Sequence, residues 1–106
     1  MPTNQAIVVD QKVPGKLIIH DIAMPQLLPS EALVRVSAIS LNRGETRRSI
    51  QAEDGWRPGW DLAGVVEQAA ADGSGPHTGG RVVGLLPDGA WAQYVAVPSH
   101  ALAVLP

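Results

Sequence analysis

Turn residues divide this chain into short apolar segments, and that spacing restricts its fold more than any other feature. Eleven glycines and nine prolines are spread over 106 residues. The segments between them suit strands better than helices, because most are only four to ten residues long. Many short strands at turn-punctuated spacing predict a mainly β fold, a sandwich or a barrel. The expected strands cover residues 6–9, 17–22, 31–39, 62–71, 81–86 and 91–97.

Local signals refine this outline. Residues 42–50 are the best candidate for a short helix, with Asn42 as its N-cap, because they carry Glu, Thr and Arg and no glycine after Gly44. The sequence Pro87-Asp88-Gly89 predicts a hairpin between strands 81–86 and 91–97, with Gly89 at positive φ. Gly64, inside strand 62–71, predicts a bulge or a close backbone contact.

Composition excludes several function classes. The chain is 45% apolar and 17% charged, which is enough apolar surface for one compact domain. A net charge of -2 argues against nucleic acid as a partner, since that binding needs a basic surface. No cysteine is present, so disulfides and thiolate chemistry are excluded. Without a signal peptide or a membrane-length apolar run of about 20 residues, the expected location is the cytoplasm, with no membrane partner.

Catalytic signatures of the common kinds are missing. The histidines His20, His77 and His100 have no metal-ligand spacing. There is no Gly-x-Ser-x-Gly elbow and no Gly-x-Gly-x-x-Gly between a strand and a helix, so the chain contains no dinucleotide-binding unit. Asp61 is a single carboxylate that either acts as a buried acid or orients loop amides or an arginine.

Four motifs in order carry a family resemblance. They are Asn42, Gly59-Trp60-Asp61-Leu62-Ala63-Gly64-Val65-Val66, residues 80–85 and residues 89–95. In this order and at these separations they resemble the catalytic domain of medium-chain dehydrogenases and reductases. The resemblance covers essentially the whole chain, residues 1–106, and implies a GroES-like, partly open β-barrel with one or two short helices. Gly80-Arg81-Val82 departs from the commoner Gly-Asp-Arg-Val.

The resemblance also implies a member without zinc. In zinc-using relatives a cysteine and a histidine occupy the places of Asn42 and Trp60. Such relatives often carry a four-cysteine lobe after the strand that here spans residues 81–86. Only four residues separate that strand from Trp91, which leaves no room for the lobe.

Site residues follow from the same resemblance. Asn42 would face the nicotinamide end of the cofactor as the catalytic and cofactor-binding residue, a role compatible with capping a helix. Arg43 is the second cofactor-binding candidate, although the cluster Arg43, Arg47 and Arg48 also reads as solvated surface. Trp60, Leu86 and Trp91 are expected in the substrate pocket. The alternative for each of these three is a core or rim side chain of the barrel.

The implied function is that of an NAD(P)H-dependent oxidoreductase that reduces quinones or activated double bonds. NADPH, or NADH, would be bound mainly by a dinucleotide-binding domain that this chain lacks, so the isolated chain is expected to be inactive. The full-length parent is expected to be a homodimer acting on a small-molecule substrate. The alternative is a stand-alone GroES-like module used for binding or assembly, without catalysis.

Overall fold

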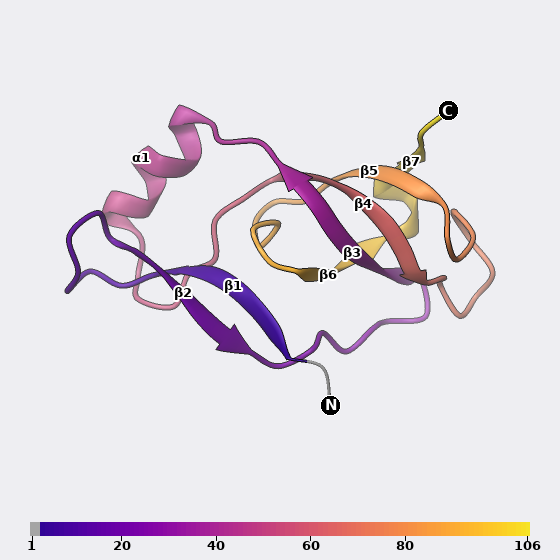
Figure 1. Cartoon of the computed structure of the whole chain (residues 1–106), viewed down its shortest axis with the longest axis horizontal. Coiled ribbons are helices and arrows are strands. Elements are labelled where there is room, and N and C mark those ends of the chain that lie inside the picture. Colours follow the sequence, from indigo (N-terminus) through magenta and orange to yellow (C-terminus); the bar gives the residue numbers. More distant parts are fainter. Residues whose placement is uncertain (1–2) are drawn as a thin grey trace.

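The computed structural model describes residues 3–106 and contains two antiparallel sheets (Figure 1). The smaller sheet pairs β1 (Asn4–Val9) with β2 (Leu17–Ile22). The turn between them places Gly15 and Lys16 at positive φ, 79° and 66°. One side of this hairpin is left open to solvent, since Ile19 is 71% exposed.

The larger sheet has five strands in the order β6-β3-β4-β5-β7. They are β3 (Glu31–Ile39), β4 (Asp61–Gln68), β5 (Arg81–Leu85), β6 (Tyr94–Pro98) and β7 (Leu102–Val104). Helix α1 (Arg43–Gln51) connects β3 to the segment before β4, and the 3₁₀ turn η1 (Ser99–Ala101) connects β6 to β7. Gln11, in the β1–β2 turn, donates from its side chain to the carbonyls of Ser49 and Ala52 and so ties that turn to the end of α1.

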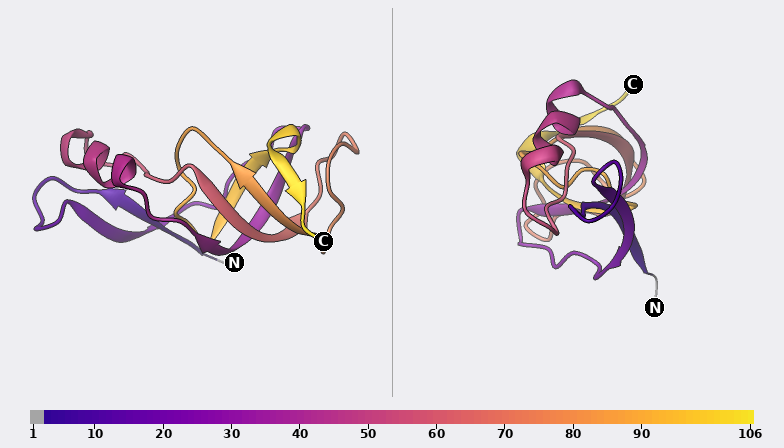
Figure 2. Two further views of the ribbon diagram at one scale, coloured as in Figure 1. Left: turned by 90° about the horizontal axis from the view of Figure 1, so that it is seen from above. Right: turned by 90° about the vertical axis from the view of Figure 1, so that its left-hand side faces the viewer.

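The connection between β6 and β7 shows why the sheet curls. These strands lie at opposite edges of the five-stranded sheet, yet only the three residues of η1 separate them. In a flat sheet, four strand spacings would hold the edges about 19 Å apart, farther than three residues reach. The sheet therefore bends until its edges approach, as the end-on view in Figure 2 shows. This partly open barrel confirms the predicted fold class.

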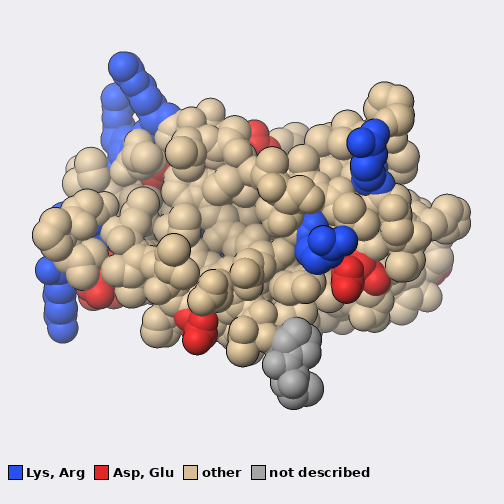
Figure 3. Space-filling view, in the orientation of Figure 1, with Lys and Arg blue, Asp and Glu red and all other residues tan. Residues whose placement is uncertain are grey.

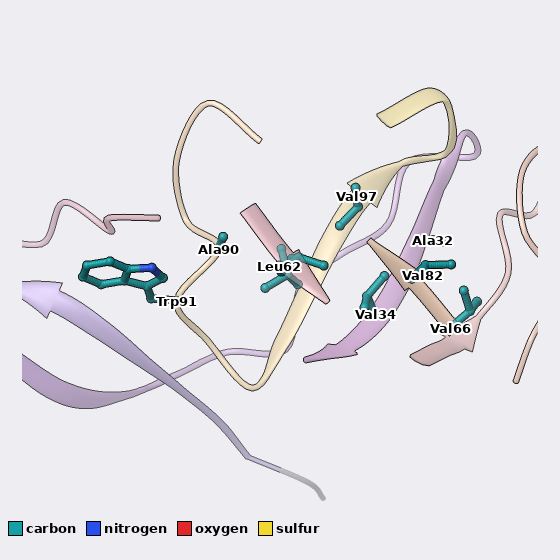
Figure 4. Packing of buried hydrophobic residues seen from close by; sticks show 9 residues of the cluster. Ala32, Val34, Leu62, Val66, Val82, Ala90, Trp91 and Val97 are labelled. Atoms are coloured by element: carbon teal, nitrogen blue, oxygen red, sulfur yellow. The ribbon is translucent and has the colours of Figure 1, made fainter. Parts of the chain in front are cut away.

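Alternating side chains of the curled sheet fill the barrel core. In β4, Leu62, Gly64 and Val66 are buried, while the residues between them are partly exposed. Figure 4 shows the resulting cluster, with Trp91 at one end and Val66 at the other. The buried members of the cluster are Ala32, Val34, Leu62, Val66, Val82, Ala90, Trp91, Val95 and Val97.

Gly64 confirms the predicted close backbone contact. A Cβ at this position would lie 2.2 Å from the carbonyl oxygen of Arg35 on the neighbouring strand. The β3–β4 register shifts between Val36 and Ala38, next to this contact. A side chain at position 64 would therefore force the two backbones apart.

The predicted hairpin between residues 81–86 and 91–97 is wrong. Strand β5 pairs with β4 and β7, whereas β6 pairs with β3. Residues 89–91 instead donate backbone hydrogen bonds to the carbonyls of Arg57, Gly59 and Pro58. Gly89 has the expected positive φ of 83°, but the chain after it pairs with the segment before β4 and not with β5.

Strand limits differ in smaller ways. The strand expected over 91–97 begins only at Tyr94, and the one expected over 62–71 ends at Gln68. Strand β7 was not expected, because three residues carry too little pattern to indicate a strand. Within residues 3–106, no helix has the length and apolar character needed to cross a membrane.

Candidate functional site

The functional candidates gather where β3 ends and α1 begins. Asn42 has extended backbone angles, φ -116° and ψ 150°, and is the N-cap of α1. Its backbone N–H donates to Oε1 of Glu45 over 2.9 Å, so the two residues form a capping box. The predicted capping role of Asn42 is confirmed.

Glu45 is the centre of this site. Its side chain has no exposed surface. Besides the Asn42 backbone N–H, Oε1 accepts a bond of 2.9 Å from Asn42 Nδ2, and Oε2 accepts one of 3.0 Å from the Trp60 backbone N–H. Glu45 thus joins the helix start to the segment that leads into β4. Glu45 was not among the residues expected from the sequence, although the Asn-x-x-Glu spacing of a capping box could have indicated it.

The carboxamide of Asn42 has a defined orientation. Nδ2 donates to Glu45 Oε1 and, over 3.2 Å, to Ser40 Oγ. A carboxylate only accepts hydrogen bonds, so the nitrogen and not the oxygen of the carboxamide faces Glu45. Oδ1 is the accepting end of the carboxamide and has two lone pairs, at least one of which is available to a donor outside the helix. Asn42 itself is half-buried.

Ser40 connects this site to two further side chains. Its hydroxyl donates to Oδ1 of Asp61, and its carbonyl accepts a bond of 3.2 Å from Trp91 Nε1. Asp61 therefore binds a hydroxyl, where the sequence suggested loop amides or an arginine. Ser40 was another residue that sequence reasoning missed, since no motif marks it.

Trp60 and Leu86 are bonded to each other through their backbones. The Leu86 N–H donates to the Trp60 carbonyl over 2.8 Å, and both residues are half-buried. The indole of Trp60 lies against Gly44 of α1. The carboxylate of Glu45 thus bonds Asn42 and Trp60, while Leu86 is bonded to the Trp60 backbone and packs against the barrel core.

Trp91 stands apart from that group. It is 3% exposed, packs against Gly59 and lines a cavity of about 280 Å³ that also borders β1 and the end of β3. A larger cavity of about 600 Å³ lies against the row Ala38, Ala63, Val83 and Ala103, which are paired across four neighbouring strands. Asn42, Trp60 and Leu86 line neither cavity.

Basic residues lie along α1. Arg43, in the first turn, is exposed, as are Arg47 and Arg48. The guanidinium of Arg48 stacks over the Trp56 ring at 4.9 Å from its centroid. Figure 3 shows lysines and arginines as separate groups on this face, with acidic residues between some of them.

Arg57 holds the loop that precedes Trp60. One guanidinium nitrogen, Nη2, donates to the Gly89 carbonyl over 2.9 Å. Burial lowers the pKa of this guanidinium from its usual value, and the nearby Asp88 carboxylate opposes that shift. The guanidinium remains a cation, because arginine does not lose its proton in proteins.

Potential metal ligands do not converge in the part of the chain that the structure describes. His20 lies in β2, His77 in the loop before β5 and His100 in η1. Among residues 3–106 no three His, Cys, Asp or Glu side chains form a group that could hold a metal ion. The two carboxylates of the site, Glu45 and Asp61, already accept hydrogen bonds from protein groups.

Comparison with known families agrees with this architecture. Residues 28–106 match the family model of the alcohol dehydrogenase GroES-like domain. The chain belongs to the alcohol dehydrogenase GroES-like domain family. This confirms the resemblance to medium-chain dehydrogenases and reductases.

Relatives of this chain include oxidoreductases. The trans-enoyl reductase caaB of Aspergillus niger is 32% identical over 117 residues, covering 100% of this chain and 32% of the relative. The quinone oxidoreductase of Thermus thermophilus, whose structure is known with NADPH, superposes with a TM-score of 0.75 at 30% identity, over 96% of this chain and 32% of that chain. The human synaptic vesicle membrane protein VAT-1 homolog-like protein gives a TM-score of 0.89 at 26% identity, over 100% and 36%. The chain therefore spans about a third of the length of these relatives.

Proposed function

We propose that this GroES-like domain is the catalytic-domain portion of a zinc-independent, NAD(P)H-dependent reductase of activated double bonds or quinones. The observation that carries the proposal is the site at the start of α1. There the buried carboxylate of Glu45 holds Asn42 and the backbone of Trp60, and Leu86 is bonded to the same segment. Similarity to a trans-enoyl reductase and to a quinone oxidoreductase supports these two substrate classes.

NADPH or NADH would supply the hydride when bound, and we propose that a domain outside this chain holds most of it. Two groups here fit the cofactor. Asn42 Oδ1 keeps a lone pair that can accept from a hydroxyl, and the exposed guanidinium of Arg43 follows it in the first turn of α1. In this proposal Asn42 orients the nicotinamide end and Arg43 attracts a phosphate.

The orientation of Asn42 distinguishes two groups that its side chain could bond, the ribose of the nicotinamide and the carbonyl of the substrate. Donating to a substrate carbonyl would require Nδ2, whose two hydrogens bond Glu45 and Ser40. Accepting from a ribose hydroxyl requires only Oδ1. We therefore assign Asn42 to the ribose of the nicotinamide and not to the substrate carbonyl.

The residues present do not fit a catalytic zinc. Such a site needs three convergent protein ligands. By the family resemblance, Asn42 and Trp60 take the places of the cysteine and histidine ligands, but they offer only a carboxamide and an indole. The carboxylates of Glu45 and Asp61 already accept hydrogen bonds from protein groups. Conjugated substrates suit such a site, because a delocalised enolate needs less help from a Lewis acid than a simple alkoxide does.

Trp60 and Leu86 are our proposed wall of the substrate pocket. Both side chains are apolar and half-buried, and the indole of Trp60 lies against the first turn of α1, so a domain that packs over this region would enclose them. Trp91 is buried, packs against Gly59 and bonds the Ser40 carbonyl, so in this proposal it supports the segments next to Trp60 and Asn42 and does not line the pocket.

The test is hydride transfer by the complete protein that carries this domain. NADPH and NADH would be supplied with matched panels of quinones, enones and simple alcohols, and metal content would be measured on the same sample. We expect NAD(P)H oxidation with enones or quinones that survives chelation. Zinc at one equivalent per chain, lost together with alcohol oxidation on chelation, would refute the proposal.

A binding or assembly module is the second candidate. The observation that favours it is the uncovered apolar surface around the larger cavity, where Leu85 and Val83 are 66% and 38% exposed. The same assay separates the candidates, because a module without catalysis would oxidise neither cofactor with any member of the panel.

A further inference from the structure

Glu45 is a fully buried carboxylate with no cationic partner among residues 3–106. The ion pair described in this range joins Arg35 to Glu67 instead. An unpaired buried charge is costly, so it persists only where hydrogen bonds replace water. Three N–H donors do so here: the backbone N–H of Asn42, Nδ2 of Asn42 and the backbone N–H of Trp60.

Two of these three hydrogen bonds are not part of a helix cap. A capping box uses the N3 carboxylate to bond the N-cap backbone N–H, and the Asn42 N–H fulfils that function. The bond to Asn42 Nδ2 fixes a side chain, and the bond to the Trp60 N–H reaches a residue 15 positions away in sequence. Both additional donors belong to residues of the proposed reductase site.

We propose that Glu45 is a positioning residue of that site, an inference that rests on the proposed function. Its carboxylate fixes the side chain of Asn42 with nitrogen inward, which makes Asn42 an acceptor for a hydroxyl-bearing ligand. The second oxygen fixes the backbone of Trp60 relative to Asn42. Glu45 does not touch the ligand and acts through Asn42.

Glu45→Gln is the direct test, because glutamine keeps the shape and loses one acceptor. A single amide oxygen cannot serve both Asn42 and the Trp60 N–H, so one of the two is released. In the complete protein with NADPH and its best enone or quinone, we expect kcat/KM to fall by about tenfold to a hundredfold, as small displacements of orienting groups do. Glu53→Gln, an exposed glutamate outside the site, is the matched control and should leave kcat/KM unchanged.

Coupling to Asn42 distinguishes positioning from mere support of the fold. Glu45→Gln should reduce kcat/KM in the wild-type background and have little further effect when Asn42→Ala is already present. Its effect on Tm should persist in both backgrounds. An equal fold-loss of kcat/KM in both backgrounds would overturn the proposal.

A second variant, Asn42→Asp, tests the same proposal if the Glu45→Gln protein does not fold. Asn42→Asp keeps the shape and the outer oxygen but places a carboxylate against Glu45, which should repel it. We expect kcat/KM to fall as far as in Asn42→Ala, and activity near that of the wild type would contradict positioning by Glu45.

The positioning of Asn42 and Trp60 by Glu45 can also be measured by NMR, without an activity assay. In isotope-labelled protein, Glu45→Gln should shift the Nδ2 proton resonances of Asn42 or the backbone N–H resonance of Trp60, and Glu53→Gln should shift neither. Unmoved resonances in both groups would overturn the inference. A wild-type protein that transfers no hydride would instead refute the proposed function, while these resonances would still decide whether Glu45 holds Asn42.

Discussion

The indole of Trp60 lies so close to Gly44 that a Cβ on this glycine would stand 2.7 Å from its Cη2 atom. Gly44 lies within α1 and has an ordinary negative φ, so steric contact and not backbone conformation favours glycine here. Any larger residue would move the indole away from the helix. The contact therefore fixes where Trp60 stands beside Asn42.

Gly44→Ala should destabilise the domain by about 1–2 kcal/mol, because the extra methyl group overpacks against the indole. In a Trp60→Ala background, the same change should stabilise by about 0.5–1 kcal/mol, since alanine is the better helix former once the contact is gone. Urea unfolding of the four proteins measures both effects. The same sign in both backgrounds would show that the contact does not restrict position 44.

The two tryptophans of the site should differ in their contribution to stability. Trp91 is 3% exposed and bonds Ser40 through Nε1, so Trp91→Ala should cost about 3–5 kcal/mol. Trp60 is half-buried, and Trp60→Ala should cost about 1–3 kcal/mol. Thermal and urea unfolding of both variants check this order, and a reversed order would mean that Trp60 is the more enclosed indole.

Trp60→Ala should have its main effect on substrate choice. If Trp60 forms the wall beside Asn42, its removal should raise kcat/KM for bulky enones or quinones relative to small ones. A size series assayed with the complete protein measures the ratio. Leu86→Ala should shift it in the same direction, because Leu86 is the second residue of the proposed wall and the variant keeps the backbone bond to Trp60. A ratio unchanged in both variants would place the pocket elsewhere.

Local patterns in the sequence were sufficient to predict most of the fold. Alternating apolar residues and turn signals indicated β1 to β6, and Gly64 was recognised as a close contact because a glycine inside a strand needs a reason. The pairing of β5 was not predictable in this way. Pro87-Asp88-Gly89 has the residues of a hairpin turn, but β5 is already paired with β4 on one edge and with β7 on the other. Neither edge is left for β6.

The site was predictable in part and for a similar reason. Asn42 and Trp60 were indicated by the family motifs, and the structure joins them through Glu45. Leu86 was expected from the resemblance alone, and its backbone is bonded to that of Trp60. Glu45 was overlooked because a charged residue in a short helix usually faces solvent. Its burial depends on Trp60 folding back over α1, a contact between segments 15 residues apart that no local pattern shows.

Asp72 should titrate below its ordinary pKa of 3.8. Hydrogen bonds from the Ser74 side chain and then the Ser74 backbone stabilise the carboxylate and lower its pKa. A pKa lowered by folding adds stability above the unfolded value, and this contribution is lost as the pH falls through the folded value. Ser74→Ala should therefore raise the pKa of Asp72 partway, as measured by NMR titration of its carboxyl carbon. Ser37→Ala is the control, and an unchanged pKa in Ser74→Ala would contradict the assignment.

Residues 1–106 alone should bind NADPH only weakly. The glycine-rich segment around Gly73 and Gly75 joins β4 to β5 and is not followed by a helix, so it cannot present a helix N-terminus to the pyrophosphate. The N-terminus of α1 is no substitute, because the carboxylate of Glu45 already occupies it. What remains is the exposed arginine cluster of α1, whose attraction for phosphate is screened at an ionic strength of about 0.15 M. Calorimetry should show at most weak, salt-sensitive binding that Arg43→Ala reduces further. A micromolar Kd at that ionic strength would show that this domain holds more of the cofactor than we propose.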